Sequence, residues 1–218
     1  MRLRSGVGFM LLAALPTRAV LAQPFQLNLD RSQSFLAVRV DKAGVFSAFA
    51  GHRHGILATT WSTQTCWDVA NPPGSSVSIV VKTASLRIDT PEAREKAGVE
   101  PGGPSASDIE QIQGKMLGPK NLAAESYPEI TFKTESVRRK DQNTIVLTGP
   151  LTIRGQTRKA SADVTIHQSG SSSDFTGRFT IKLTDFGIQP ESVAGVVNVK
   201  DEIQIRFHFS GTPGGACQ

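Results

Sequence analysis

The sequence predicts an all-β fold: an antiparallel sandwich or closed β-barrel of about eight strands, with one short helix inserted between strands. Three observations predict it. Apolar and polar residues alternate with period two along most of the chain, which is typical of half-buried antiparallel strands. Short clusters rich in glycine, proline, asparagine and serine separate these runs. Only one stretch has helical spacing. Many short strands at such intervals indicate a sandwich or a barrel.

The first 22 residues have the pattern of a secretory signal peptide. Arg2 and Arg4 precede an apolar run over residues 7–15, and small residues precede the expected cleavage after Ala22. The run is far shorter than the ~20 residues of a membrane-spanning helix. We therefore expect a periplasmic or secreted protein without a stable membrane anchor.

The charge of the mature chain excludes one class of partner. Cleavage removes three of the 24 Lys and Arg residues and none of the 19 Asp and Glu residues, so 21 basic side chains remain against 19 acidic ones. Such a small excess gives no reason to expect nucleic-acid binding. No basic block with interleaved aromatic residues is present in the sequence either.

The remaining chain is predicted to be one domain. No internal repeat or linker divides residues 23–212, whose length suits a single core. Residues 213–218 include Gly214 and Gly215 and are expected to form a flexible tail. An exported compartment permits a disulfide between Cys66 and Cys217, but the place of Cys217 in that tail leaves the pairing open.

The strands can be followed along the chain by their alternation. Leu36, Val38 and Val40 share one face, as do Val77, Ile79 and Val81. The same pattern recurs over residues 145–153, 162–166, 179–183 and 203–209. Turn signals stand at residues 71–74, 140–143, 154–156 and 169–173.

One segment departs from this pattern. Ser107 and Glu110 have the Ser-x-x-Glu spacing of a capping box, and apolar residues follow at helical spacing as far as Met116, before Gly118 and Pro119 end the run. This predicts the short inserted helix. Residues 91–104 before it are charged and rich in glycine and proline, which predicts a mobile loop.

Apolar side chains on the inward strand faces are the candidate ligand-binding residues. The alternation fits two interiors, a core filled by its own side chains or a hollow for one small ligand, because a barrel of about eight strands is wide enough for either. A long hydrocarbon needs little polar recognition, since each buried methylene contributes about 0.8 kcal/mol. The candidates are Val38, Val40, Ile79, Val81, Phe132, Leu147, Leu151, Phe179, Ile181, Phe186 and Phe207.

His52 and His54, in the string Ala-Gly-His-Arg-His-Gly-Ile, are the most distinctive polar feature. On a strand, both rings lie on one face. Three roles stay open. The pair could bond nearby backbone, with Gly51 and Gly55 supplying conformations that other residues resist. It could instead contact the polar head of a ligand, or bind a metal ion.

Metal binding and catalysis have weaker support. A metal site needs a third or fourth ligand, and the alternation around His167 and His208 points both of them outward. No Gly-x-Ser-x-Gly elbow, phosphate-cradling loop or dinucleotide fingerprint occurs in the sequence, so we assign no catalytic residue. A metal-binding protein, and behind it a lipid-acting enzyme with a histidine base, are the alternatives to a carrier.

Several strings together resemble the YceI-like family. They are Ser-Tyr-Pro-Glu-Ile-Thr-Phe at 126–132, the run 147–157, Asp-Phe-Gly-Ile at 185–188 and the closing strand 199–209, in the family's order. The resemblance implies a lipocalin-like antiparallel barrel that holds a polyisoprenoid chain, such as a quinone side chain or an isoprenoid phosphate. It also implies an exported binding protein without a further cofactor, often a homodimer. The family more often has a Gly-x-Phe entry where this chain has Gly51 to Gly55.

Overall fold

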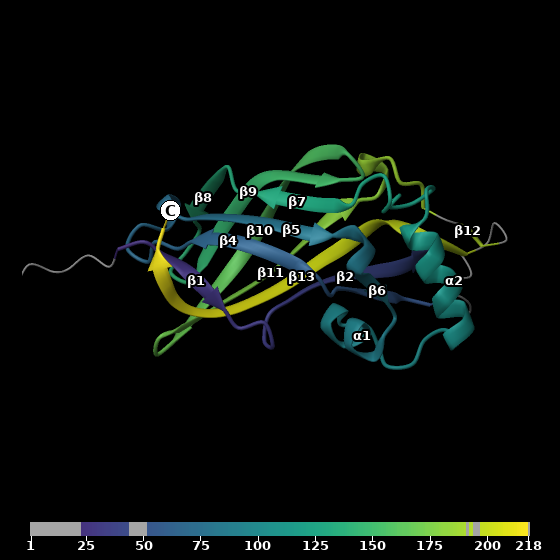
Figure 1. The fold of residues 1–218 in the computed structure, drawn as a ribbon, viewed down its shortest axis with the longest axis horizontal. Coiled ribbons are helices and arrows are strands. Elements are labelled where there is room, and N and C mark those ends of the chain that lie inside the picture. Colours follow the sequence, from purple (N-terminus) through teal and green to yellow (C-terminus); the bar gives the residue numbers. More distant parts are fainter. Residues whose placement is uncertain (1–22, 44–51, 191, 194–196, 218) are drawn as a thin grey trace, which may run out of the picture.

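The computed structural model of the protein describes residues 23–43, 52–190, 192–193 and 197–217 (Figure 1). The predicted signal peptide, residues 1–22, and Gly51 lie outside these residues. The helices are α1 (Pro91–Ala97) and α2 (Ala106–Leu117). The strands are β1 (Phe25–Leu29), β2 (Phe35–Ala43), β3 (His54–Ala58), β4 (Trp61–Cys66), β5 (Ser76–Lys82), β6 (Leu86–Ile88), β7 (Glu129–Lys133), β8 (Ser136–Arg139), β9 (Thr144–Ile153), β10 (Gln156–Ser169), β11 (Ser172–Lys182), β12 (Ser192–Val193) and β13 (Val197–Ala216).

Thirteen strands of the described chain form one antiparallel sheet that curls around an apolar interior (Figure 1). The main path runs β4-β5-β7-β9-β10-β11-β13-β2-β3-β6, while β1 and β12 pair with β13 and β8 pairs with β9. The predicted all-β, antiparallel barrel fold is confirmed. The strand count is higher than the predicted eight, because strands as short as β6, β8 and β12 contain too few alternations to be recognised in the sequence.

Strand β1 draws the two sides of the curled sheet together at one end. Phe25 lies opposite Ala216 of β13 and also exchanges backbone hydrogen bonds with Trp67, just beyond β4, at N···O distances of 3.1 and 2.8 Å. Two residues on, the Leu27 amide donates to Thr65 Oγ1 at 3.1 Å. A disulfide between Cys66 and Cys217 adds a covalent link between β4 and the end of β13.

The predicted flexible tail is therefore wrong for the residues that the structure describes. Residues 213–216 continue β13, and Cys217 is bonded to Cys66. The glycines that suggested fraying are accommodated as strand residues, because the partner strand β1 satisfies the backbone of this segment. The cysteine pairing, which the sequence left open, is present.

The inserted helix α2 exists, but its cap differs from the predicted one. The N-cap is Ser105, whose hydroxyl accepts a hydrogen bond from the Asp108 amide at 3.3 Å, so the cap lies two residues before Ser107. Gln113 then ties α2 to β6: its Oε1 accepts from the Ile88 amide at 3.0 Å and its Nε2 donates to the Leu86 carbonyl at 2.8 Å.

Helix α1 occupies the segment predicted as a mobile loop. Thr90 caps it by accepting from the Ala93 amide at 3.1 Å, and Gly98 ends it in the left-handed conformation. Its buried residues are Ala93, Arg94 and Ala97, of which the two alanines are fully buried against β2 and β3. Small side chains give no strong periodic signal in the sequence, which is why this helix was missed.

Helix α2 lies at the end of the sheet opposite the C-terminus, and α1 lies beside the sheet in the same half of the molecule (Figure 1). Neither is long and apolar enough to cross a membrane, a finding limited to helices within the described ranges.

Candidate functional site

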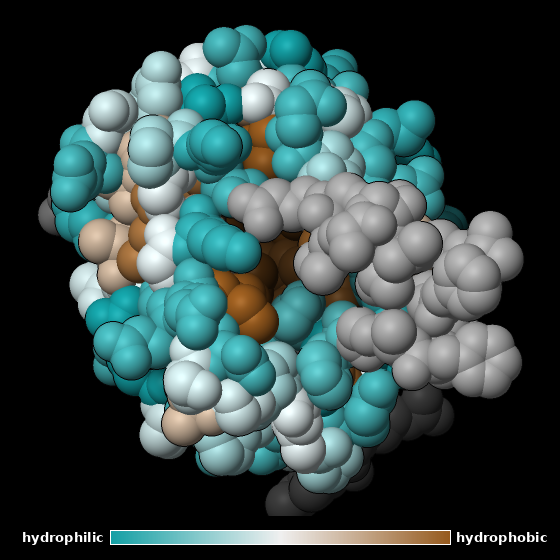
Figure 2. Space-filling view, turned by 90° about the vertical axis from the view of Figure 1, so that its right-hand side faces the viewer, coloured by the Kyte–Doolittle hydropathy of each residue, from teal (hydrophilic) through white to brown (hydrophobic). Residues whose placement is uncertain are grey.

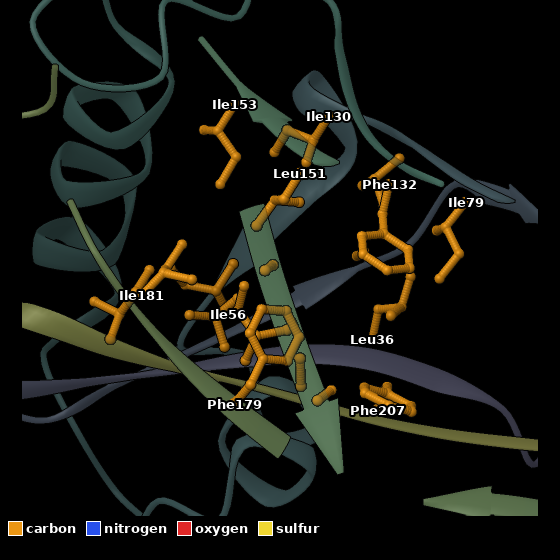
Figure 3. A pocket seen from close by; sticks show the side chains of 18 of the residues that line it. Leu36, Ile56, Ile79, Ile130, Phe132, Leu151, Ile153, Phe179, Ile181 and Phe207 are labelled. Atoms are coloured by element: carbon orange, nitrogen blue, oxygen red, sulfur yellow. The ribbon is translucent and has the colours of Figure 1, made fainter. Parts of the chain in front are cut away.

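The interior of the curled sheet contains a cavity of about 450 Å³. Side chains from facing strands converge on it: Phe179 and Ile181 from β11 face Phe132 and Ile79 across the space (Figure 3). The interior is therefore not filled by its own side chains. Its volume lies within the ~300–1,000 Å³ that is usual for small-molecule pockets.

All the predicted ligand-binding residues line this cavity. They are His52, His54, Val38, Val40, Ile79, Val81, Phe132, Leu147, Leu151, Phe179, Ile181, Phe186 and Phe207. Period-two alternation found the apolar residues on strands, because it identifies the strand face that turns inward whether or not that face is packed. Phe186, predicted on a strand, lies instead in the 3-10 turn Thr184–Phe186, and His52 lies before β3. That they contact a ligand stays a prediction.

Other lining residues were missed. At the end fastened by the disulfide, Trp67 and Phe175 pack edge to face with ring centroids 5.1 Å apart, and both line the cavity. From α2 come Ile112 and Met116. The helical spacing of Ile112 and Met116 was visible in the sequence, but which side of the barrel the helix covers depends on contacts with β6 that are remote along the chain.

The cavity opens at the end that carries helix α2. Figure 2 shows this end with an apolar hollow surrounded by a mostly hydrophilic rim. The ionisable side chains among the described lining residues, apart from the disulfide-bonded Cys66, are Lys42, His52, His54 and Lys115, and none of the described lining residues is an aspartate or glutamate.

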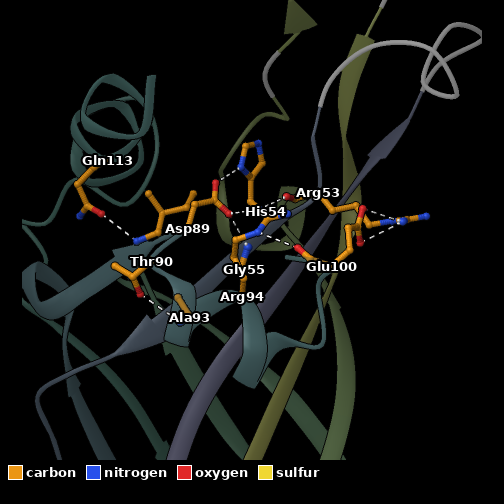
Figure 4. Close-up of polar contacts among 10 residues, drawn as sticks. Arg53, His54, Gly55, Asp89, Thr90, Ala93, Arg94, Glu100 and Gln113 are labelled. Atoms are coloured by element: carbon orange, nitrogen blue, oxygen red, sulfur yellow. Dashed lines mark hydrogen bonds and ion pairs between the residues drawn. The ribbon is translucent and has the colours of Figure 1, made fainter. Parts of the chain in front are cut away.

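His54 is held at this end by a buried carboxylate. Its Nδ1 lies 2.5 Å from Asp89 Oδ2, and the Asp89 side chain is 0% exposed against 16% for His54 (Figure 4). The other Asp89 oxygen accepts from the Gly55 amide at 3.1 Å and from Arg94 Nη1 at 2.7 Å. Of the three roles left open for the histidine pair, the structural one takes a different form at His54, whose bond is to a carboxylate and not to backbone.

This environment keeps Asp89 ionised. Burial on its own raises the pKa of the Asp89 carboxyl, but the hydrogen bonds from His54, Gly55 and Arg94 outweigh it and lower that pKa below its usual value. An ionised carboxylate only accepts hydrogen bonds, so His54 Nδ1 carries a proton. The second ring nitrogen, Nε2, points away from Asp89 (Figure 4).

The local chain geometry explains how these groups meet. Asp89 sits between β6 and α1 with φ of 54°, and its amide donates to the Gly55 carbonyl at 2.7 Å. Arg94 projects from α1 and also donates to the carbonyls of Arg53 and Glu100, each at 2.9 Å. The α1 segment therefore fixes Arg53 and His54 of the His-Arg-His string to one buried ion pair.

Gly55 is required for space, not for an unusual backbone angle. It lies within β3, and a Cβ added there would stand 2.6 Å from the Ala93 carbonyl oxygen. The interpretation of Gly55 as a conformational glycine was wrong. Its absent side chain lets α1 approach β3 closely enough for Arg94 to reach Asp89.

The remaining histidines lie away from this site. His167 is exposed on β10, as predicted. His208 is half-buried: it stacks on Phe35 and lies 3.0 Å from Thr176 Oγ1. Within the ranges described, no group of three or more His, Cys, Asp and Glu side chains could hold a metal ion. The pairing of His54 with Asp89 also occupies one of the nitrogens that a metal would use.

The family model described as the YceI-like domain matches residues 27–210. Among curated relatives, a UPF0312 protein of Pseudomonas fluorescens SBW25 is 24% identical over 183 residues, which cover 81% of this chain and 82% of that protein. A UPF0312 protein of Pseudomonas putida W619 is 28% identical over 129 residues, covering 56% of this chain and 57% of that one.

Solved structures share the fold. BcnA of Burkholderia cenocepacia has a TM-score of 0.64 at 21% identity, covering 85% of this chain and all of that one. A polyisoprenoid binding domain from Saccharophagus degradans has a TM-score of 0.54 at 10% identity, covering 88% of this chain and 100% of that chain. Because the family model extends across the whole curled sheet from β1 to β13, the chain belongs to the family of YceI-like domains.

Proposed function

We propose that the protein is an exported carrier that holds a long apolar ligand, polyisoprenoid or quinone-like, inside the curled sheet. The observation that carries this proposal is a cavity of about 450 Å³ whose lining is almost entirely apolar and which opens at one end. The polyisoprenoid binding domain of Saccharophagus degradans, which has the same fold, supports it.

The length of the ligand follows from the energetics of apolar burial. Association costs roughly 4–15 kcal/mol in lost translational and rotational freedom. Each buried methylene returns about 0.8 kcal/mol, so a chain of about 15 carbons contributes about 12 kcal/mol. Short apolar molecules would bind weakly, whereas a chain that runs the length of the cavity would bind without strong polar contacts.

Lipid extraction of freshly purified mature protein, followed by mass spectrometry, tests the proposal directly. We expect a long-chain apolar lipid in stoichiometric amount. Purification from the natural host is preferred, because the lipid repertoire then matches the cellular one. Protein that yields no lipid and binds none added to it would refute the carrier function.

A matched pair of variants localises the ligand. Ile181 faces the cavity, and its neighbour Thr180 is exposed on the other face of β11. Ile181→Trp fills the cavity and should reduce bound lipid about 10-fold or more, since overpacking costs roughly 1–3 kcal/mol. Thr180→Trp adds the same side chain outside and should retain the lipid. Equal lipid content in both variants would place the ligand elsewhere.

Export and assembly are further parts of the proposal. If residues 1–22 are cleaved, N-terminal sequencing of the protein from a periplasmic fraction or culture medium should show a chain that begins at Gln23.

The homodimer implied by the family resemblance stays a prediction, which sedimentation velocity tests. Elemental analysis of the protein and of a His52→Ala/His54→Ala variant tests the metal-binding alternative. That alternative predicts bound metal in the unaltered protein and none in the variant.

A further inference from the structure

Among the described lining residues, the ionisable side chains are basic ones, apart from the disulfide-bonded Cys66. The lysines and histidines that line it, Lys42, His52, His54 and Lys115, come from three different parts of the chain: the end of β2, the entry to β3 and the last turn of α2. No described lining residue carries a carboxylate. A neutral hydrocarbon could form neither hydrogen bonds nor ion pairs with these side chains.

These groups gather at the open end. Val40 lies opposite His54 in the antiparallel β2–β3 ladder, so Lys42, two residues after Val40, and His52, two residues before His54, lie beyond the same end of this pairing. Lys115 belongs to α2, which covers the same end of the sheet (Figure 1). A chain buried in the apolar interior would thus present its head group to these four side chains.

His54 is oriented for this contact. Asp89 fixes its Nδ1 as a proton donor, and Arg94 already balances the charge of Asp89 at 2.7 Å. His54 lines the cavity while its Nε2 points away from Asp89 (Figure 4). Protonation of Nε2 would add a positive charge and a hydrogen-bond donor at the mouth, and would leave the buried ion pair intact.

We propose that the open end of the cavity binds the anionic head group of an amphiphile, a phosphate or a carboxylate, through Lys115, His52 and Nε2 of His54. This inference rests on the proposed carrier function and adds the chemical class of the head. Because Nδ1 is paired with Asp89, His54 contacts the anion through Nε2.

The first experiment compares ligands that share a sixteen-carbon chain and differ in the head. Hexadecyl phosphate, palmitate, hexadecanol and hexadecyltrimethylammonium are each used to displace the neutral fluorophore N-phenyl-1-naphthylamine. We expect the two anions to bind about 10-fold more tightly than hexadecanol, as charge-assisted hydrogen bonds warrant, and the cation to bind more weakly. The relative affinities of hexadecyl phosphate and palmitate show whether the site prefers a phosphate or a carboxylate head group. Inorganic phosphate alone should not displace the fluorophore.

Matched variants assign the preference to residues. Lys115→Gln and His52→Gln alter exposed side chains at the mouth and should each reduce the preference for the anion about 3- to 10-fold. Lys120→Gln removes the same charge from an exposed residue outside the lining and should change nothing. An unchanged anion preference in both mouth variants would overturn the assignment.

The role of His54 has its own readout. Histidine is the side chain that gains a proton most readily between pH 8 and pH 5. The other charged or titratable groups at this end are Asp89 and Arg94 in the buried pair, Arg53 with its partners Asp41 and Glu100, and the lining residues Lys42, His52 and Lys115. Hexadecyl sulfate stays ionised throughout, so its affinity should fall as the pH rises, whereas hexadecanol affinity should stay constant. His54→Gln should weaken this dependence, and His52→Gln/His54→Gln should abolish it.

Proton uptake can also be measured without a variant. Calorimetric titration of hexadecyl sulfate in two buffers of different ionisation enthalpy should show uptake of up to one proton. No uptake and a flat pH profile would overturn the role of His54. If hexadecanol and the anions bind equally well, the head-group inference fails while the carrier function stands. If no sixteen-carbon ligand binds, the carrier function itself fails.

Discussion

The two ends of the curled sheet, one at β1 and the other at α2, differ in the side chains that they contain. At the β1 end, Trp67 and Phe175 pack edge to face, and Cys66 and Cys217 form a covalent link. At the α2 end, the cavity wall includes lysines and histidines, and the nearest buried cluster is an ion pair with a bound imidazole.

This difference separates two properties within one sheet. Apolar packing and a cross-link stabilise the closed end without distinguishing one ligand from another. The charged groups of the open end add little to stability where they are exposed, but they can discriminate between head groups. Substitutions at the closed end and at buried positions such as Asp89 should therefore change the free energy of unfolding, and those of exposed side chains at the open mouth should change ligand preference.

Removal of the disulfide should give the largest loss of stability. The bond joins cysteines 151 residues apart. The chain-entropy model assigns about 5 kcal/mol to a loop of that length. We expect Cys66→Ser/Cys217→Ser to lower the free energy of unfolding by up to that amount in urea denaturation, with the head-group preference of the folded protein unchanged. A loss of unfolding free energy below about 1 kcal/mol would mean that the pairing of β1 stabilises this end without the disulfide.

Asp89→Ala is the corresponding test at the other end. It leaves Arg94, whose side chain is 5% exposed, without its carboxylate, so we expect a loss of about 3–5 kcal/mol. Asp163→Ala breaks an exposed ion pair with Lys140 and should cost at most about 1 kcal/mol, which makes it a matched control. Equal losses in the two variants would contradict the buried role of Asp89.

The same carboxylate gives a pH dependence of known sign. Because the pKa of Asp89 in the folded protein lies below its ordinary value of 3.8, its stabilising contribution is complete above that value and is lost as the pH falls through the lowered pKa. Subtracting the stability of Asp89→Asn from that of the unaltered protein, by urea denaturation at several pH values, should give a difference that shrinks toward acid. A difference that grows toward acid would contradict this.

Gly55→Ala should disturb the open end by a smaller amount. The new Cβ would meet the Ala93 carbonyl oxygen at 2.6 Å, both of them in rigid elements, so we expect a loss of about 1–3 kcal/mol. Gly215→Ala, where nothing stands within 4 Å of the added carbon, should be nearly neutral. Thermal denaturation of the two variants checks the difference, and a neutral Gly55→Ala would show that α1 can move aside.

Sequence alone predicted the cavity wall better than the site at its mouth. Residues such as Phe179 and Ile181 follow from alternation, because a strand has only two faces and the chain marks which one is apolar. Asp89 and Arg94 were not found, because Asp89 reaches His54 across 35 residues and Arg94 reaches the Arg53 carbonyl across 41, next to a helix whose small buried alanines give little periodic signal. The pairing of Cys217 likewise depended on a strand partner, β1, that lies near the other end of the sequence.

The smallest expected effect concerns helix α2, which covers the open end. Gly114 lies in its interior with nothing within 4 Å of an added Cβ, and glycine in a helix is less stable than alanine by up to about 1 kcal/mol. Gly114→Ala should therefore raise the free energy of unfolding by up to that amount in urea denaturation. Because the change adds no charge next to Lys115, the preference for anionic heads should stay the same. A changed preference would mean that the position of α2, and not only the charge it carries, selects the ligand.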